Sequence, residues 1–207
     1  MHRGILYTAA TGLVAGGFLG GQAFAQLPAQ DFSYDYVEGG IAFTEFDRGG
    51  LDENPVGPQL IGSTLLSQDL FLLGEWSYLS DDADIFTLTL GPGYRLDITH
   101  AIDLYGVVSG AFRNIDPDGA SSDNEIGYQL IAGIRHSCMF VENLAHTWEI
   151  RYLDIDTGKD FDDGIVNLRA KPVYTLSPHW DAVGELQIDD VSDGRNLGLA
   201  LGARFNF

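Results

Sequence analysis

Residues 195–207 read R-N-L-G-L-A-L-G-A-R-F-N-F, and this stretch decides the fold. Apolar residues alternate along it with polar or small ones, and successive side chains of a strand point to opposite faces. One face carries Leu197, Leu199, Leu201, Ala203, Phe205 and Phe207. The other carries Asn196, Gly198, Ala200, Gly202, Arg204 and Asn206. A helix would spread both sets around its circumference, so the period of two predicts a strand with one apolar face.

The same alternation recurs in nine further segments, so the sequence predicts ten strands. The segments run over about 34–46, 59–66, 70–79, 86–95, 104–113, 125–136, 145–154, 165–176 and 180–188. Residues 137–144 are ambiguous between strand and turn. Pro92 has no N–H to give to a ladder, so we expect a local defect in its strand. If 59–66 or 180–188 is a loop, the number of strands falls to eight.

The connections between these segments alternate in length and in charge. Those after even-numbered segments are mostly short, as at 67–69, 97–101 and 177–179. Those after odd-numbered segments are acidic, at 47–58, 80–84, 114–124, 154–163 and 189–194. Short turns on one rim and longer loops on the other are typical of bacterial outer-membrane barrels, whose long loops face the outside of the cell. A soluble sandwich of two sheets does not require this rhythm.

The first residues have the pattern of an export signal. Residues 1–25 combine a basic start, an apolar run over 5–19 and the triplet Ala23-Phe24-Ala25. This is the pattern of a secretory signal peptide with an A-x-A cleavage site. A permanent membrane anchor is the alternative, but the run is short and rich in glycine. We therefore expect cleavage to leave one barrel domain, residues 26–207.

Charge and cysteine content narrow the classes of partner. The formal net charge of −19 disfavours nucleic acid as a ligand. Cys138 is the single cysteine, so the chain can form no internal disulfide. It does not follow the export signal, which excludes a lipoprotein. An inert thiol in a turn is the simpler interpretation of Cys138, and a mixed disulfide in an oxidising compartment is the alternative.

Charged residues of both signs share the polar phase of the predicted strands. The basic ones are Arg95, Arg113, Arg135, Arg151, Arg169, Lys171 and Arg204, and the acidic ones are Glu38, Glu75, Asp103, Glu125, Glu149, Asp181 and Glu185. A barrel of eight to ten strands is narrow enough to be filled by side chains. We expect these groups to pair as an arginine–carboxylate network that plugs the lumen. A soluble protein with its apolar face inside would instead carry them on its surface.

Four segments resemble the strand motifs of small outer-membrane β-barrels of Gram-negative bacteria, the OmpA- and OmpX-like type. They are 34–40 (YDYVEGG), 74–78 (GEWSY), 88–95 (LTLGPGYR) and 201–207 (LGARFNF). The resemblance implies an all-β fold, a single antiparallel transmembrane barrel in up-and-down meander order, with many relatives having eight strands. It implies residence in the outer membrane, among lipid and lipopolysaccharide. It also implies that Phe205 and Phe207 form the signal read by the outer-membrane assembly machinery.

No catalytic motif emerges from the sequence. Histidine occurs at positions 2, 100, 136, 146 and 179, without a serine and an acid in the pattern of a triad and without metal-ligand spacing. The predicted outer loops contain many aspartates and no histidine, which disfavours an enzyme that needs a histidine base. An aspartate-based hydrolase at the rim is the remaining enzymatic alternative, and we expect no cofactor.

Two acidic loops, 116–125 and 154–163, place carboxylates at alternate positions, as calcium sites do. The candidate ligands are Asp116, Asp118, Asp123, Asp154, Asp156, Asp160 and Asp162. Neither loop fits the helix-flanked calcium motif, because its glycine is misplaced and no glutamate stands at the twelfth position. Solvated acidic loops are the favoured interpretation. Weak, shared binding of calcium or magnesium at the surface is the alternative.

Together these features predict a non-enzymatic outer-membrane barrel with a structural or surface-interaction role in the cell envelope. A narrow, porin-like channel for small solutes is the alternative, which a lumen without crossing charge pairs would favour. A rim-sited enzyme is the third hypothesis. The sequence names no ligand and no oligomeric state.

Overall fold

The computed structural model describes residues 32–207 apart from 49–50, 82, 118–121, 156–163 and 192–193. The predicted signal peptide lies outside the described residues and stays a prediction. The described strands are β1 (Tyr36–Arg48), β2 (Leu51–Glu53), β3 (Val56–Leu65), β4 (Leu70–Ser80), β5 (Ala83–Thr99), β6 (Ile102–Pro117), β7 (Asp123–Ser137), β8 (Leu144–Ile155), β9 (Ile165–Ser177), β10 (Trp180–Val191) and β11 (Gly194–Asn206). All eleven belong to one antiparallel sheet, in which the ten long strands close into a barrel and the short β2 pairs with the end of β1.

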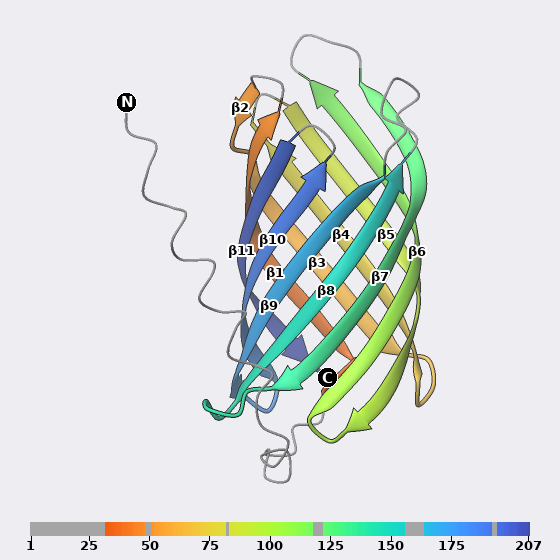
Figure 1. The fold of residues 1–207 in the computed structure, drawn as a ribbon, viewed down its shortest axis with the longest axis vertical. Coiled ribbons are helices and arrows are strands. Elements are labelled where there is room, and N and C mark those ends of the chain that lie inside the picture. The colour runs from red at the N-terminus through yellow and green to blue at the C-terminus, as the bar shows by residue number, and fades with distance from the viewer. Residues whose placement is uncertain (1–31, 49–50, 82, 118–121, 156–163, 192–193) are drawn as a thin grey trace.

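The sheet is an antiparallel meander that closes on itself (Figure 1). Each long strand pairs with its neighbours in sequence, and β1 pairs with both β3 and β11. The predicted ten-stranded barrel is therefore confirmed, and the eight-stranded alternative is wrong because β3 and β10 are both fully paired. At the closure, a Cβ on Gly40 would lie 2.6 Å from the carbonyl oxygen of Leu201, so glycine is required there.

Proline interrupts the ladder on one side of its strand. Pro92 lies opposite Leu72 of β4, but the pairing of β5 with β6 lapses between Leu90 and Gly93. The register is the same on both sides of the gap, so the strand continues without a bulge. The local defect predicted at Pro92 is confirmed, and its cause is the missing N–H donor.

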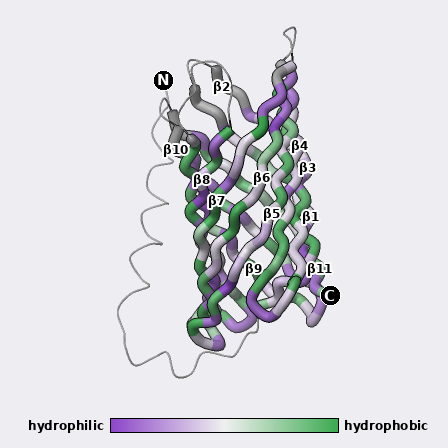
Figure 2. Tube along the Cα trace, turned by 90° about the vertical axis from the view of Figure 1, so that its right-hand side faces the viewer, coloured by the Kyte–Doolittle hydropathy of each residue, from purple (hydrophilic) through white to green (hydrophobic). Residues whose placement is uncertain are grey.

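The outward face of the sheet is apolar along its strands, and Figure 2 shows hydrophobic and hydrophilic residues alternating along the tube. Exposed apolar side chains on this face include Ile41, Leu90, Ile126, Leu130, Ile150, Leu168, Leu199 and Leu201. A monomeric soluble protein rarely exposes so much contiguous apolar surface, whereas lipid accommodates it. The soluble alternative, with the apolar phase inside, is therefore wrong.

The two rims of the barrel differ as the sequence predicts. Short turns join β3 to β4, β5 to β6, β7 to β8 and β9 to β10 on the rim where the chain also ends (Figure 1). We call this the periplasmic rim and the opposite one the outer rim. In the ambiguous segment 137–144, Ser137 ends β7, Leu144 begins β8, and 138–143 form a turn in which Asn143 adopts a φ of 64°. Cys138 lies in this turn, half-buried, and its N–H donates to the carbonyl of Leu144.

Candidate functional site: the filled lumen

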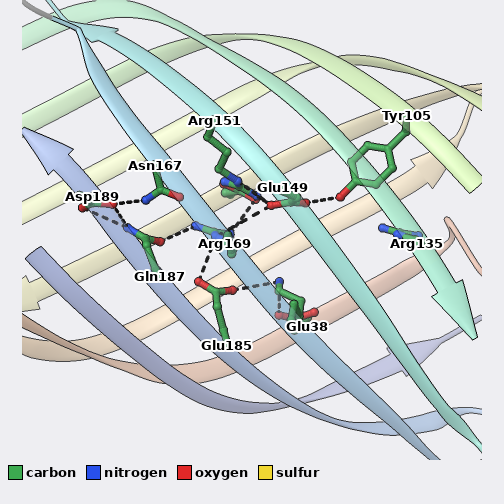
Figure 3. Close-up of polar contacts among 12 residues, drawn as sticks. Glu38, Tyr105, Arg135, Glu149, Arg151, Asn167, Arg169, Glu185, Gln187 and Asp189 are labelled. Carbon is green, nitrogen blue, oxygen red and sulfur yellow. Dashed lines mark hydrogen bonds and ion pairs between the residues drawn. The ribbon is translucent and has the colours of Figure 1, made fainter. Parts of the chain in front are cut away.

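Side chains of the inward phase fill the barrel at three levels, and Figure 3 shows the middle of this arrangement. A charge network crosses the centre of the lumen. A group of tyrosines lies between that network and the periplasmic rim. A polar cavity lies between the network and the outer rim. Because the strands are antiparallel, residues of one level come from distant parts of the sequence.

Arg151 of β8 is the most completely enclosed cation of the central level, with 3% of its surface exposed. Its Nη1 and Nη2 lie 2.5 Å and 2.7 Å from the two carboxylate oxygens of Glu75 on β4. Its Nη2 also lies 2.6 Å from Oε2 of Glu149. The two-pronged pairing with Glu75 is the geometry that a planar guanidinium favours with a carboxylate. It links two strands across the lumen rather than two neighbours in the sheet.

The pairing continues around the lumen from β8 to β1. Arg169 lies 3.1 Å from Glu185, and Lys171 lies 3.2 Å from the other oxygen of the same carboxylate. Ion pairs of 2.9 Å and 2.8 Å then join Glu38 to Lys171 and to Arg204. We define the central charge network as Arg151, Arg169, Lys171, Arg204, Glu38, Glu75, Glu149 and Glu185. Its four cations and four carboxylates balance, and removing one partner would leave the other buried without compensation.

A second set of side chains encloses Arg135 nearer the periplasmic rim. The guanidinium carbon of Arg135 lies 4.3 Å from the centre of the Tyr34 ring, 5.2 Å from that of Tyr105 and 5.8 Å from that of Tyr36. Phe71 packs against Tyr34, with 4.8 Å between ring centres. These distances are those of cation–π and aromatic contacts. We call Tyr34, Tyr36, Phe71, Tyr105 and Arg135 the tyrosine cluster.

The segment before β1 enters this cluster from below. Tyr34 is 1% exposed, and Arg135 donates to the backbone carbonyl of Ser33. Asp35 anchors the segment, because its carboxylate accepts hydrogen bonds from the N–H of Leu65 at 2.7 Å and from the Thr64 hydroxyl. Burial raises the pKa of Tyr34 to about 12. The sequence alone places Tyr34 in the first strand, but β1 begins two residues later and Tyr34 closes the mouth instead.

The remaining charged residues of the predicted network lie outside its centre. Arg95 lies by the periplasmic rim, where its Nε donates to the carbonyl of Gln68, and Asp103 is directly opposite Arg135 in the sheet. Arg113 and Glu125 are opposite each other in β6 and β7, toward the outer rim.

Asp181 is buried near the C-terminus and accepts a hydrogen bond from Asn206. All of these residues point inward, as the polar phase predicts. The strand pattern does not predict which of these residues pair with one another, because the pairing depends on the folded barrel.

The polar cavity has a volume of about 180 Å³. Its lining includes the amides of Gln59, Gln129, Asn167 and Gln187. Gln187 accepts a hydrogen bond from Arg169 and donates to Asp189, so the cavity floor is continuous with the charge network. The sequence analysis did not predict this cavity. The inward positions of Gln129, Asn167 and Gln187 could have indicated it, because all three lie on the polar phase of their strands.

The predicted metal ligands do not form a site in the described part of the chain. Among its residues, no group of three or more His, Cys, Asp or Glu side chains could hold a metal ion. Asp116 is exposed at the end of β6, Asp154 is half-buried in β8, and Asp123 belongs to β7. The other candidates, Asp118, Asp156, Asp160 and Asp162, lie outside the described residues. Separately, no described helix has the length and apolar composition needed to cross a membrane.

A closed sheet with an apolar exterior and a filled, polar interior is the architecture of a β-barrel that spans the outer membrane. Every strand of such a barrel finds its backbone partners within the sheet, so the strands present no unpaired edge to lipid. The chain is therefore an outer-membrane β-barrel protein by its structure.

Comparison with known proteins finds similar solved structures and no matching sequence. No protein-family model and no curated protein sequence matches the chain. Neisserial surface protein A is similar in structure at 13% identity and a TM-score of 0.46, over 84% of this chain and 98% of that one. The KdgM porin, solved with disordered oligogalacturonate, has 10% identity and a TM-score of 0.46 over 83% and 99%. The Yersinia pestis attachment invasion locus protein Ail has 14% identity and a TM-score of 0.40 over 83% and 97%.

Proposed function

We propose that this protein is a non-enzymatic, non-conducting outer-membrane barrel with a structural or surface-interaction role in the cell envelope. The observation that carries the proposal is the central charge network, which joins side chains of β1, β4, β8, β9, β10 and β11 across the lumen. A lumen closed by ion pairs cannot conduct solutes as the lumen of a porin does. Function then belongs to the outer surface and to the barrel as a whole.

Two properties of the lumen support a closed barrel. A ten-stranded barrel is narrow, whereas water-filled pores have about 16 strands. A permeating ion would also have to separate Arg151 from Glu75, which are paired by two short contacts at 3% and 13% side-chain exposure. Below that pair the tyrosine cluster fills the periplasmic half with rings. An ion would meet two consecutive barriers of different chemistry.

The outer rim supports a surface role. Its acidic character faces the lipopolysaccharide leaflet, which is itself anionic, so contact between the two requires bridging divalent cations. Outer-membrane lipid and lipopolysaccharide are the proposed surroundings. The assembly machinery is the proposed partner of Phe205 and Phe207. In the structure Phe205 packs on Trp180 with 5.1 Å between ring centres.

Planar-bilayer recordings test the proposal directly. The purified wild-type protein should show no stable openings of porin-like conductance, because the network seals the lumen. The double variant Arg151→Ala/Glu75→Ala, which removes the central pair without leaving an unpaired partner between them, should show at most brief and small openings, because the tyrosine cluster remains as the second barrier. Stable openings in the wild type would overturn the proposal and establish the alternative, a narrow channel for small solutes. The polar cavity on the outer side of the network is the observation that favours that alternative.

Membrane residence and assembly are tested separately. The mature protein should sediment with outer membranes and migrate differently on gels before and after boiling, because a closed sheet has no edge from which to unfold. Recovery in the soluble periplasm would contradict this. Deletion of Phe207 should lower the assembled fraction, and normal assembly of that variant would remove the role proposed for the terminal aromatic residues.

A further inference from the structure

The polar cavity between the central charge network and the outer rim has the features of a binding site. Its volume is about 180 Å³. This space is well below the ~300 Å³ at which sites for drug-sized ligands begin. The ligand that fits is therefore small, of the size of a short polyol or a monosaccharide. The charge network closes the cavity below.

Three residues that line the cavity each have a buried polar atom without a hydrogen-bond partner among the described residues. These atoms are the side-chain oxygens of Gln129 and Asn167 and the Nε–H of Arg113. Gln129 and Asn167 are 7% and 8% exposed, so their amides are more than nine-tenths buried. A buried amide or guanidinium group without a partner is costly. These atoms are enclosed in the cavity wall, and small rotations of the three side chains would turn two acceptors and one donor toward the same space.

The part of the cavity nearer the outer rim is aliphatic. Leu79, Ile85, Leu153 and Ile165 belong to β4, β5, β8 and β9 and line it, and Leu153 lies directly opposite Gln129 in the β7–β8 pair. Each lies an even number of residues from an inward-facing residue of its own strand, as Leu79 does from Glu75, so these side chains are on the lumen face. A ligand that fits both parts has hydroxyl groups toward the amides and C–H groups toward the outer rim.

The charges around the cavity exclude a strongly ionic ligand. Arg113, Arg151 and Arg169 line it together with Glu75, Glu185 and Asp189, so three cations face three carboxylates. Most of these groups already share partners, as Arg151 does with Glu75 and Arg169 with Glu185. The site therefore offers no net charge to an anion or a cation. A hydroxyl group, which both donates and accepts, matches the two amide oxygens and the guanidinium donor.

We propose that the outer half of the lumen is a blind binding site for a small neutral polyhydroxylated solute, a short polyol or a monosaccharide. The hydroxyls of the solute donate to Gln129 and Asn167 and accept from Arg113, while its hydrocarbon face packs on Leu79 and Ile85. The site takes up its ligand from the outer rim and does not pass it on, since the network lies beneath. Binding does not depend on whether the barrel conducts, so this inference and the proposed function fail separately.

Ligand-observed NMR with the full-length mature protein in lipid nanodiscs tests the site. The probes are erythritol, xylitol and glucose as neutral polyols, with acetate and choline as charged small solutes. Saturation transfer to at least one neutral polyol and to neither charged solute is the expected result. Transfer to none of the polyols, or equal transfer to acetate or choline, would overturn the proposal.

Three variants place the binding in the cavity. Gln129→Met removes one acceptor at similar length, and affinity for the bound polyol should fall about tenfold, as the loss of a buried hydrogen bond implies. Ala42→Leu adds bulk to the cavity wall without touching a polar group and should also weaken binding. Ser63→Ala is the matched control, because Ser63 is buried, its hydroxyl has no hydrogen-bond partner among the described residues, and it does not line the cavity. The affinity of the Ser63→Ala variant for the polyol should equal that of the wild type.

The heat-dependent gel shift establishes that each variant is folded before binding is compared. If Gln129→Met does not fold, Ala42→Leu carries the test alone. Unchanged affinity in the folded cavity variants, or an equal loss in Ser63→Ala, would show that the polyol binds elsewhere and would overturn the assignment.

Discussion

Arg151 and Arg135 occupy equivalent positions in the sequence pattern, yet the barrel encloses them in opposite ways. Both point inward from neighbouring strands, β8 and β7, and they are 3% and 7% exposed. Arg151 is held by the carboxylates of Glu75 and Glu149. Arg135 lies among the rings of the tyrosine cluster, the nearest at 4.3 Å. The alternation of a strand thus decides that a cation is buried, and the level in the lumen decides what balances it.

The environments of Arg151 and Arg135 differ in what remains buried when the arginine is removed. Without Arg151, two carboxylates stay buried in the centre of the barrel, and an unpaired buried charge is among the most costly defects in a protein. Without Arg135, the rings of the tyrosine cluster are neutral and still pack against one another, and one carboxylate, that of Asp103, lies directly opposite in the sheet. The charge network should therefore be the more fragile of the two levels, although both fill the lumen equally well.

The largest effect is expected from Arg151→Met, which keeps most of the side-chain volume and removes the charge. We expect a loss of about 3–5 kcal/mol in the free energy of unfolding, because Glu75 and Glu149 lose their closest cation. Urea unfolding in lipid vesicles, followed by tryptophan fluorescence, measures it. The double variant Arg151→Met/Glu75→Gln should recover part of the loss, since it removes one unpaired carboxylate. A smaller loss in the free energy of unfolding than that of Arg135→Met would contradict the expected order of the two levels.

A smaller effect is expected from Arg135→Met. A desolvated cation–π contact is worth about 2 kcal/mol, so we expect a loss of about that size in the same unfolding measurement. Arg135→Lys keeps the charge but loses the planar group that lies over Tyr34 and Tyr105. Its free energy of unfolding should therefore lie between those of Arg135→Met and the wild type. If Arg135→Lys is as stable as the wild type, stacking on the rings contributes nothing and charge alone explains the cluster.

A third, smaller effect concerns ionisation of Tyr34. Its folded-state pKa is about 12, chiefly because of burial, with Arg135 and Arg95 acting to lower it. The unfolded chain has a tyrosine pKa of about 10, so the neutral phenol stabilises the fold below pH 10 and that contribution is lost as the pH rises to 12.

The variant Tyr34→Phe separates this effect from other titrations at high pH. The Tyr34 hydroxyl has no hydrogen-bond partner among the described residues, so the variant should match the wild type at pH 7. At pH 11 the wild type should be about 1 kcal/mol less stable than Tyr34→Phe. The measurement is unfolding by urea at a series of pH values. Parallel curves for the two proteins at all pH values would show that Tyr34 ionises as in the unfolded chain.

The contrast between Arg151 and Arg135 also shows how far the sequence reaches. The period of two predicts ten strands, their outward apolar face and an inward phase that contains both arginines, because each strand decides these features locally. The partner of Arg204 follows once the closure is known, since Glu38 lies directly opposite it in the β1–β11 pair. The partner of Arg151 does not, because Glu75 is across the lumen. Which residues meet there depends on the stagger and tilt of the whole barrel.

The tyrosine cluster was missed for a different reason. Phe71 and Leu73 are apolar residues on the inward phase of β4, so a rule that sends apolar residues to lipid does not find them. Tyr34 lies before the first strand, where the period of two has no meaning. The amides of the polar cavity pointed inward in the pattern, but nothing local distinguishes an amide that lines a cavity from one that packs. In each case the strand pattern does not give the position of the residue along the barrel, between the periplasmic rim and the outer rim.

The smallest effect is expected at the outer rim, where carboxylates face carboxylates instead of arginines or rings. Asp84 of β5 lies directly opposite Asp116 of β6 at this rim, and Asp116 is exposed to water. Water screens their repulsion, so neither cations of the chain nor aromatic rings are needed there. Two opposed carboxylates supply oxygen ligands for calcium or magnesium, with dissociation constants expected at about 1 mM, or about 4 kcal/mol.

Calorimetric titration of calcium into the vesicle-bound protein measures this binding, with Asp116→Asn as the variant and Asp97→Asn, an exposed acid by the periplasmic rim, as the matched control. The first should weaken binding about twofold, because other rim acids share the ion, and the second should leave it unchanged when the barrel is inserted in one orientation. If calcium and magnesium give no heat even at about 10 mM, solvation alone explains the acidic rim. The barrel would then balance its charges in two ways inside the lumen and leave them to water outside it.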